Sequence, residues 1–300
     1  ASEFRYREPI VGKNDLGIVI SQSGETMDTI AATELLKENG SHVLALVNVV
    51  GSSLARMADS VFYLHVGPEI GVASTKAYLG MLVSQLVIAK HWDSKNRLNV
   101  SFDEIAELPN LIDKTMACED QIKEISEKIY KKNDIYFIGR GLDYALAAEG
   151  ALKLKEISYL HAEALAAGEL KHGTLALIEE GTPVIVTASQ NHLLDKTTSN
   201  VQEVIARGAY VIAIGDSESE KLENISNDYV TLPDSNEILT TVISIIPLQF
   251  IAYHVANKNG QSIDQPRNLA KSVTVESVSY THLRAHETPE HLVCRLMREK

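Results

Sequence analysis

Cysteine, proline and tryptophan are scarce in this chain of 300 residues, which holds two cysteines, eight prolines and one tryptophan. Two cysteines, Cys118 and Cys294, cannot build a disulfide framework, so we expect a reducing, cytoplasmic setting. No run of about 18 apolar residues occurs, and a membrane-spanning helix is therefore not expected. The first residues also lack the apolar core of a signal peptide.

Positive charge is in deficit, because 28 Lys and Arg stand against 40 Asp and Glu and the net charge is −12. This balance argues against nucleic acid as a main partner. It leaves a small anionic ligand open, because loop amides and helix N-termini bind phosphate whatever the net charge. A hydrophobic content of 45% with 23% charged residues is typical of a globular protein.

Short aliphatic runs alternate with helical patterns along the chain, which predicts an α/β fold with a parallel sheet. The expected strands of the first part are Leu16–Ile20, Val43–Val47 and Val61–His65, and the expected helices run to Asn39, over Ser53–Ala58 and over Val72–Trp92. A further helix is expected over Leu111–Lys131 and a strand over Ile135–Ile138. Glu149–Gly173 is expected to be helical through its first half, and the stretch is expected to break at Gly168.

The second half of the chain repeats the first. Pro183–Thr187 parallels Gly17–Ser21, and an apolar helix over Glu237–Asn257 parallels the one that ends at Trp92. The second copy has about 49 residues before its matching strand and the first has about 16, so we expect the first domain to lack its opening strand and helix. The absence of an initial Met agrees with a fragment. The predicted fold class is therefore two doubly wound parallel-sheet domains, the first truncated at its N-terminus.

The repeat and the polar connectors set the expected boundaries. They are a first domain at 1–97, a linker helix at 98–132, a second domain at 133–260, a C-terminal strap at 261–276 and a non-native tail at 277–300.

Acid–base groups gather in Glu149–Gly173. A helix places Glu149, Lys153 and Glu156 on one stripe, and His172 follows the break. Two carboxylates, an amine and an imidazole are enough for acid–base work on a small polar substrate. The alternative is a solvated helix face with an ordinary Glu–Lys pair, worth a few tenths of a kcal/mol.

Ser21–Thr26 follows the first expected strand and opens a helix, where parallel sheets bind ligands. Its hydroxyls and backbone N–H groups suit a phosphate, whereas the alternative, an N-cap, needs only one hydroxyl. Val72–Lys76 adds hydroxyls at the start of another helix, either for the same pocket or as a cap. Lys271 is either a surface lysine or an amine that condenses with a sugar carbonyl.

Three histidines lie in the tail. His282 and His286 have i, i+4 spacing, but no acidic or cysteine ligand has matching spacing, so we expect no metal site.

These blocks together resemble the isomerase part of the glucosamine-6-phosphate synthase family, also called glutamine–fructose-6-phosphate aminotransferase (isomerizing). The resemblance covers residues 1–276 and is carried by SQSGET at Ser21–Thr26, GVASTKA at Gly71–Ala77, EGALKLKEISY at Glu149–Tyr159, AGELKHG at Ala167–Gly173 and DQPRNLAKSVTVE at Asp264–Glu276. It implies two sugar-isomerase (SIS) domains of flavodoxin-like type and a glutaminase domain that this chain lacks.

The resemblance also implies roles for individual residues. Glu156 matches the base that moves a proton between C1 and C2, and Lys271 matches the lysine that forms a Schiff base with fructose 6-phosphate. His172 matches a histidine that assists ring opening and is donated across a homodimer interface. Glu149 and Lys153 match supporting positions. The residues that match the phosphate loop and the sugar contacts are Ser21, Gln22, Ser23, Thr26, Val72 and Ser74.

The expected activity is conversion of fructose 6-phosphate and ammonia to glucosamine 6-phosphate, at the entry to amino-sugar synthesis. The resemblance implies no metal or organic cofactor, no nucleic acid and no membrane. Two alternatives remain: a sugar-phosphate-binding SIS module without turnover, and a fragment that does not fold.

Overall fold

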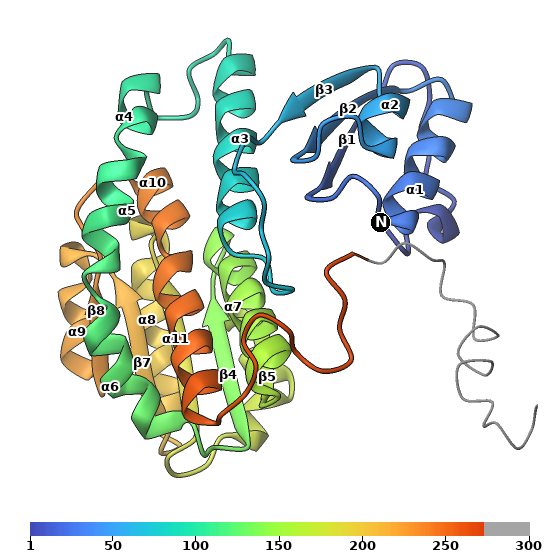
Figure 1. Ribbon diagram of the computed structural model, residues 1–300. Helices are drawn as coiled ribbons and strands as arrows, with labels where there is room; N and C mark the ends of the chain where they lie inside the picture. Colours follow the sequence, from blue (N-terminus) through green and yellow to red (C-terminus); the bar gives the residue numbers. More distant parts are fainter. Residues whose placement is uncertain (273–300) are drawn as a thin grey trace, which may run out of the picture. The chain divides into compact units, whose positions relative to one another are not determined.

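A computed structural model describes residues 1–272 of the chain (Figure 1). It divides into two compact units, one of residues 1–65 with Ser272 and one of residues 66–271. Each unit has helices packed on a sheet whose strand pairs are all parallel. The prediction of an α/β fold with two parallel sheets is therefore confirmed. The expected domain boundaries follow the sequence repeat rather than compactness, and they stay a prediction.

The first unit is a three-stranded sheet in the order β1-β2-β3. Its elements are η1 (Arg5–Arg7), β1 (Leu16–Ser21), α1 (Met27–Glu38), β2 (His42–Val47), α2 (Ser53–Met57) and β3 (Ser60–Tyr63). Its buried core is small, with Val43, Ala45 and Val47 of β2 at the centre. Strand β1 lies at the edge of the sheet, and its residues Leu16 and Ile18 are each 45% exposed.

The second unit has a five-stranded sheet in the order β5-β4-β6-β7-β8. Its strands are β4 (Asp134–Gly139), β5 (His161–Ala166), β6 (Pro183–Ala188), β7 (Tyr210–Gly215) and β8 (Asp228–Thr231). By the repeat, β6 corresponds to β1. The first sheet has no counterpart of β4 and β5 within residues 1–272.

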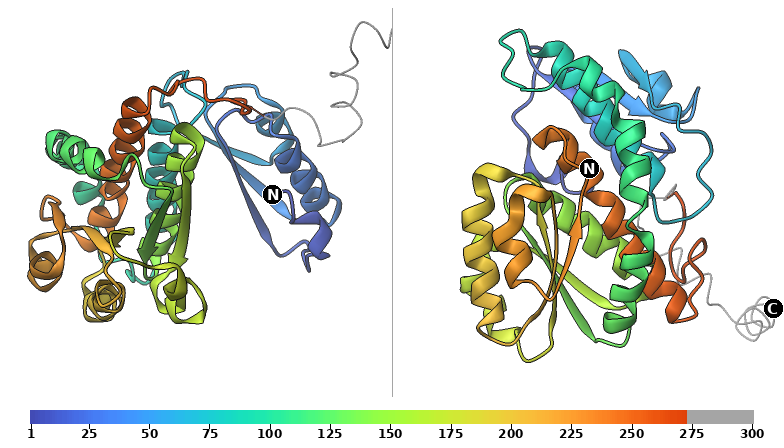
Figure 2. Two further views of the ribbon diagram at one scale, coloured as in Figure 1. Left: turned by 90° about the horizontal axis from the view of Figure 1, so that it is seen from below. Right: turned by 90° about the vertical axis from the view of Figure 1, so that its left-hand side faces the viewer.

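Helices cover both faces of this second sheet, as Figure 2 shows. Successive side chains of a strand point to opposite faces, so Ile135 and Phe137 of β4 enter one core while Tyr136 and Ile138 enter the other. The first core is shared with α6, α7 and α11, and the second with α8 and α9. The helices are α3 (Lys76–Trp92), α4 (Phe102–Ala106), α5 (Leu108–Met116), α6 (Glu119–Ile129), α7 (Leu142–Ser158), α8 (Leu194–Ile205), α9 (Glu220–Ile225), α10 (Glu237–Ile243) and α11 (Ile245–Lys258).

The region expected to be one linker helix at 98–132 contains three helices, α4, α5 and α6. A capping box at Ser101 and Glu104 begins α4, and Pro109 lies in the first turn of α5, where proline is tolerated. The single helix expected over Leu111–Lys131 is wrong, because the chain turns at Ala117 and Cys118 between α5 and α6.

One further expectation is corrected. The helix expected from Val72 begins at Lys76, because the backbone at Thr75 departs from helical values. The helix expected through the first half of Glu149–Gly173 ends at Ser158, because Tyr159 adopts the left-handed conformation with φ of 63°. The residues beyond it form β5, which pairs with β4, and then the 3₁₀ helix η2 (Ala167–His172).

One stretch, Glu237–Lys258, is long and apolar enough to cross a membrane by length and composition alone. It comprises α10 and α11, and 72% of its apolar window is buried inside the protein. That burial is typical of the core helix of a globular domain, and it explains the apolar composition without a membrane.

Candidate functional site

The stripe on α7 forms a charged cluster in the second unit. The Nζ of Lys153 lies 2.6 Å from Oε2 of Glu156 and 3.3 Å from Oε1 of Glu149. The whole residue Lys153 is only 4% exposed, so this is not the solvated Glu–Lys pair of the alternative interpretation. One buried amine therefore serves two carboxylates.

Burial raises the pKa of two groups around this amine. Burial raises the pKa of Glu149, although the nearby Lys153 partly offsets the increase. Burial, with the charge of Glu149, also raises the pKa of Tyr78 on α3 to about 12, so its hydroxyl stays protonated at neutral pH. The cluster thus contains one carboxyl group, that of Glu149, whose pKa lies above that of an exposed glutamate.

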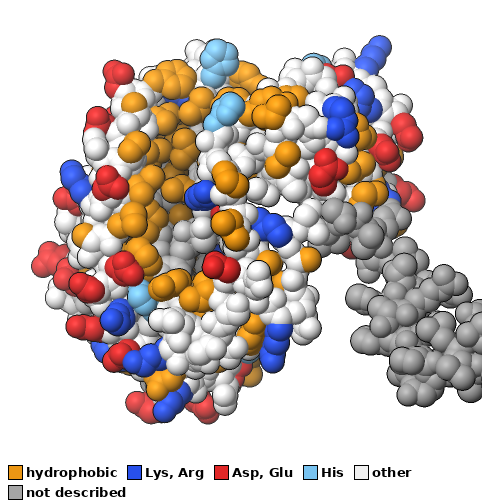
Figure 3. Space-filling view, in the orientation of Figure 1, with side chains coloured by type: hydrophobic (Ala, Val, Ile, Leu, Met, Phe, Trp, Pro, Cys, Tyr) orange, Lys and Arg blue, Asp and Glu red, His pale blue; other side chains and the backbone are white. Residues whose placement is uncertain are grey.

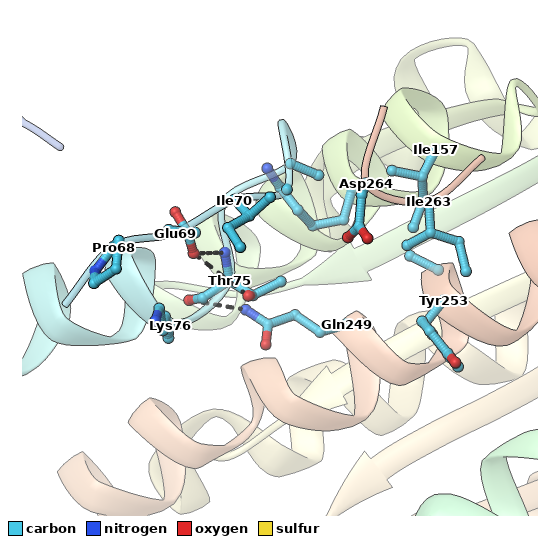
Figure 4. Close-up of a pocket in the computed structure, with 14 residues that line it drawn as sticks. Pro68, Glu69, Ile70, Thr75, Lys76, Ile157, Gln249, Tyr253, Ile263 and Asp264 are labelled. Atoms are coloured by element: carbon cyan, nitrogen blue, oxygen red, sulfur yellow. Dashed lines mark hydrogen bonds between the residues drawn. The ribbon is translucent and has the colours of Figure 1, made fainter. Parts of the chain in front are cut away.

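Lys153 also lines a pocket of about 470 Å³ (Figure 4). This volume lies in the range of small-molecule sites. The other charged residues that line the pocket are Glu69, Lys76 and Asp264, and Gln249 and Tyr253 of α11 add polar groups. All of the lining residues belong to the second unit.

Glu69 is a site residue that the sequence analysis missed. Its Oε1 accepts hydrogen bonds from the backbone N–H groups of Thr75 (2.8 Å) and Ala77 (3.2 Å), and its Oε2 accepts one from Ser74 Oγ (3.0 Å). The Nζ of Lys271 lies 2.7 Å from the same Oε2. Burial acts to raise the pKa of Glu69, but these hydrogen bonds outweigh it and hold the pKa below its usual value.

The loop before α3 and the first turn of that helix therefore donate hydrogen bonds to the carboxylate of Glu69. Ser74 lies here, and its hydroxyl donates to Glu69. Val72 donates its backbone N–H to the carbonyl of Asp264 at 2.9 Å. The only sequence signal for Glu69 is its position two residues before the Gly71–Ala77 block.

The strap that carries Lys271 is tied down at several points. The carbonyl of Asp264 accepts a hydrogen bond from the backbone N–H of Val72, and the Arg267 backbone N–H donates to the Tyr159 hydroxyl at 2.8 Å. The Arg267 guanidinium also stacks over the Tyr159 ring, 4.2 Å from its centroid. Lys271 follows four residues later, where Glu69 holds its amine.

The predicted phosphate loop belongs to the first unit. The Ser21 Oγ accepts from the backbone N–H of Gly24 at 3.0 Å and lies 3.3 Å from Thr26 Oγ1. The Ser23 Oγ accepts from the N–H of Glu25 at 3.2 Å and lies 3.2 Å from Ser272 Oγ. Thr26 is the N-cap residue of α1, but its side chain makes no capping hydrogen bond.

Ser52 packs closely against Gly24 of this loop. Gly24 has φ of +66°, and a Cβ there would lie 2.1 Å from the Ser52 Oγ. Ser52 is buried, and its hydroxyl has no hydrogen-bond partner. The loop hydroxyls, Gln22 and the free N–H groups of the first turn remain the candidate phosphate ligands.

One predicted residue lies away from this network. His172, the last residue of η2, is exposed and does not line the pocket. His282 and His286 lie outside the described residues. Among residues 1–272, no group of three His, Cys, Asp or Glu side chains is arranged to hold a metal ion.

A second hollow is apolar. On the face drawn in Figure 3, hydrophobic side chains gather over the helices of the second unit. A groove of about 360 Å³ lies there, and its lining residues are Thr75, Lys76, Leu79, Ile112, Met116, Glu119, Ile246, Gln249, Phe250 and Tyr253. Its apolar lining contrasts with the first pocket, where charged groups converge.

Comparison with known proteins identifies the family. The family model described as "SIS domain" matches residues 1–90 and 128–257. The chain belongs to the SIS domain family. Two relatives are both glutamine–fructose-6-phosphate aminotransferase (isomerizing): the protein of Caldanaerobacter subterraneus subsp. tengcongensis is 50% identical over 282 residues, and that of Clostridium tetani is 48% identical. Each match covers 92% of this chain, and the chain spans about half, 46%, of the relative's length.

Solved structures are similar to this chain as well. The C-terminal domain of glucosamine-fructose-6-phosphate aminotransferase from Francisella tularensis is similar with a TM-score of 0.81 and 40% identity, over 88% of this chain and 77% of that one. Glucosamine-6-phosphate deaminase from Thermotoga maritima has a TM-score of 0.71 over 91% of this chain and 79% of its own, and at 23% identity it shows a shared fold alone. The chain is thus a homologue of the isomerase part of the aminotransferase.

Proposed function

We propose that this chain converts fructose 6-phosphate and ammonia to glucosamine 6-phosphate, as the isomerase part of a glutamine–fructose-6-phosphate aminotransferase. The observation that carries the proposal is the pocket of the second unit. It is lined by Lys153, which holds Glu156, and by Glu69, which holds the amine of Lys271. An amine for the carbonyl and a carboxylate for the proton therefore belong to one compact unit.

The proposed reaction begins at the carbonyl. The amine of Lys271 attacks C2 of the open-chain sugar, water leaves, and a protonated imine forms. Ammonia then replaces the lysine nitrogen at C2. The imine draws electrons from C1, so Glu156 can remove a C1 proton and return it to C2, which leaves an aldehyde at C1 and an amine at C2.

The remaining assignments follow the sequence. Ser21, Gln22, Ser23 and Thr26 hold the phosphate, and Val72 and Ser74 line the sugar. Glu149 and Lys153 support the base, and Lys153 neutralises the charge that Glu156 carries. No cofactor takes part. The setting is cytoplasmic, where hexose phosphates and reduced cysteines both occur.

We further propose a homodimer in which His172 reaches the partner's site and assists ring opening. The support is that His172 is exposed and lies outside the pocket lining. A dimer also explains why a histidine in this motif need not approach Lys153 of its own chain.

The test is an assay of the 300-residue chain with fructose 6-phosphate, with and without ammonia. Glu156→Gln should lower kcat about 10²- to 10⁴-fold, the range for removal of a general base, and Lys271→Ala should abolish aminated product. Lys258→Ala is the matched control, because Lys258 is an exposed lysine paired with Glu127. Full activity in either site variant refutes the assignment. Binding of the sugar without turnover in native chain would instead favour a binding module.

A further inference from the structure

The amine of Lys271 and the carboxylate of Glu69 form an unusually well-supported pair. Their Nζ and Oε2 atoms lie 2.7 Å apart, and the two residues are 202 positions apart in the sequence. The Glu69 side chain is 5% exposed, whereas that of Lys271 is 27% exposed. The carboxylate of Glu69 is therefore buried in the protein, whereas the side chain of Lys271 is partly exposed to solvent.

Three other donors fix the orientation of Glu69. Thr75 N–H and Ala77 N–H come from the start of α3, and the third donor is the hydroxyl of Ser74. Because a helix N-terminus favours negative charge, the first turn of α3 stabilises the ionised form of Glu69. Figure 4 shows Glu69 and Thr75 joined in this way at the wall of the pocket.

We propose that Glu69 is a positioning residue that serves as the fixed counter-ion of the Lys271 nitrogen. This inference rests on the proposed function, because it concerns the same lysine. The nitrogen carries a positive charge twice: first as the free ammonium group and again as the protonated imine. A carboxylate that cannot move away stabilises both forms and holds the nitrogen in one place between them.

The other acidic groups near the pocket do not supply this charge. Glu149 and Glu156 are held by Lys153. Asp264 lines the pocket, but its described tie to the loop before α3 runs through its backbone carbonyl. Glu69 is the acidic side chain that contacts Lys271 within residues 1–272.

The first test needs no substrate. The native chain and Glu69→Gln are labelled briefly with acetic anhydride, which acylates only unprotonated amines, and the modification of Lys271 is measured by mass spectrometry. Lys271 should react several-fold faster in the variant, because the carboxylate that engages its Nζ at 2.7 Å is gone. Equal rates in the two proteins overturn the inference.

Two variants control this measurement. Glu69→Asp keeps the charge and should bring the rate back toward the native value, which a purely structural role of the side chain does not predict. Glu127→Gln removes the carboxylate from the pair with Lys258, whose atoms lie 2.6 Å apart on the surface. Glu127→Gln should leave the labelling rate of Lys271 unchanged. A faster rate in this variant would show that loss of a glutamate elsewhere has the same effect.

The second test traps the imine. Borohydride reduction in the presence of fructose 6-phosphate should attach the sugar phosphate to Lys271 in native chain, and about tenfold less adduct should form in Glu69→Gln under the same conditions. If native chain forms no adduct, the proposed function fails while the labelling result still decides the role of Glu69. If both proteins form the same adduct and label equally, the function stands and this inference alone fails.

Discussion

The Nζ of Lys153 lies 2.6 Å from Oε2 of Glu156, on the same face of α7 and one turn away. Burial of a charged amine is costly unless partners offset the loss of water. Here Glu156 and Glu149 both contact the amine, so the cluster carries one positive and up to two negative charges. This arrangement links the stability of α7 to the chemistry proposed for Glu156.

Removal of the shared amine should be costly. In Lys153→Met the aliphatic volume is kept, but two partly buried carboxylates lose their cation. We expect the free energy of unfolding to fall by about 3 kcal/mol, the lower end of the cost of breaking a buried pair. Urea denaturation measures this, with Lys155→Met, an exposed lysine on the same helix, as the control. A loss below 0.5 kcal/mol, about that of an exposed helical pair, would contradict it.

Glu69 should make stability depend on pH. Its folded pKa lies below the ordinary value of 4.5, so its contribution is present above pH 4.5 and is lost as the pH falls through the folded pKa. The difference in unfolding free energy between native chain and Glu69→Gln should therefore be larger at pH 7 than at pH 3. Urea unfolding at both values measures it, and a difference that does not change with pH would count against the ionised form.

Gly24 and Gly51 offer a matched comparison in the first unit. Both have positive φ, +66° and +71°, but a Cβ at Gly51 would meet nothing within 4 Å, whereas one at Gly24 would overlap Ser52. Gly51→Ala should cost about 1 kcal/mol from backbone strain alone. Gly24→Ala should cost at least about 1 kcal/mol more from overpacking, and should weaken fructose 6-phosphate binding. Equal losses of stability and equal affinities in the two variants would show that Ser52 can move to accommodate the added methyl group.

The hydroxyl of Tyr159 should protect the strap. In Tyr159→Phe the backbone N–H of Arg267 loses its acceptor while the ring keeps its stacking with the guanidinium. A net hydrogen bond of about 1 kcal/mol predicts roughly fivefold faster hydrogen exchange at that amide. Arg267→Ala keeps the acceptor and is the control, since its amide should exchange at nearly the native rate. The reverse order of the two rates would mean that stacking, not the hydrogen bond, holds the strap.

The strands and the repeat could be predicted because buried parallel strands are short aliphatic runs, and these are local in sequence. The predictions for β1, β2 and β4 are accordingly close to the observed bounds. Strand β5 was missed because His161–Ala166 is rich in alanine, a strong helix former, and only pairing with β4 makes it extended. Tertiary contacts thus override local propensity there.

The part of the candidate site that lies on one helix could be predicted, and the part that joins distant residues could not. Glu149, Lys153 and Glu156 share one helical stripe, so their spacing alone brought them together, and the structure has them in contact. Glu69 and Lys271 could not be paired from spacing, because no local period joins residues 202 apart. The start of α3 was placed too early for the same reason, since the loop at Val72–Thr75 follows the carboxylate of Glu69 rather than a helical pattern.

The contact between Glu69 and Lys271 also bears on the order of assembly. Lys271 is the last residue of the second unit, and its partner Glu69 lies near the first residue of that unit. The two side chains therefore cannot pair until the whole unit has been synthesised. Chemical labelling of Lys271 during refolding measures when these two ends of the unit pair.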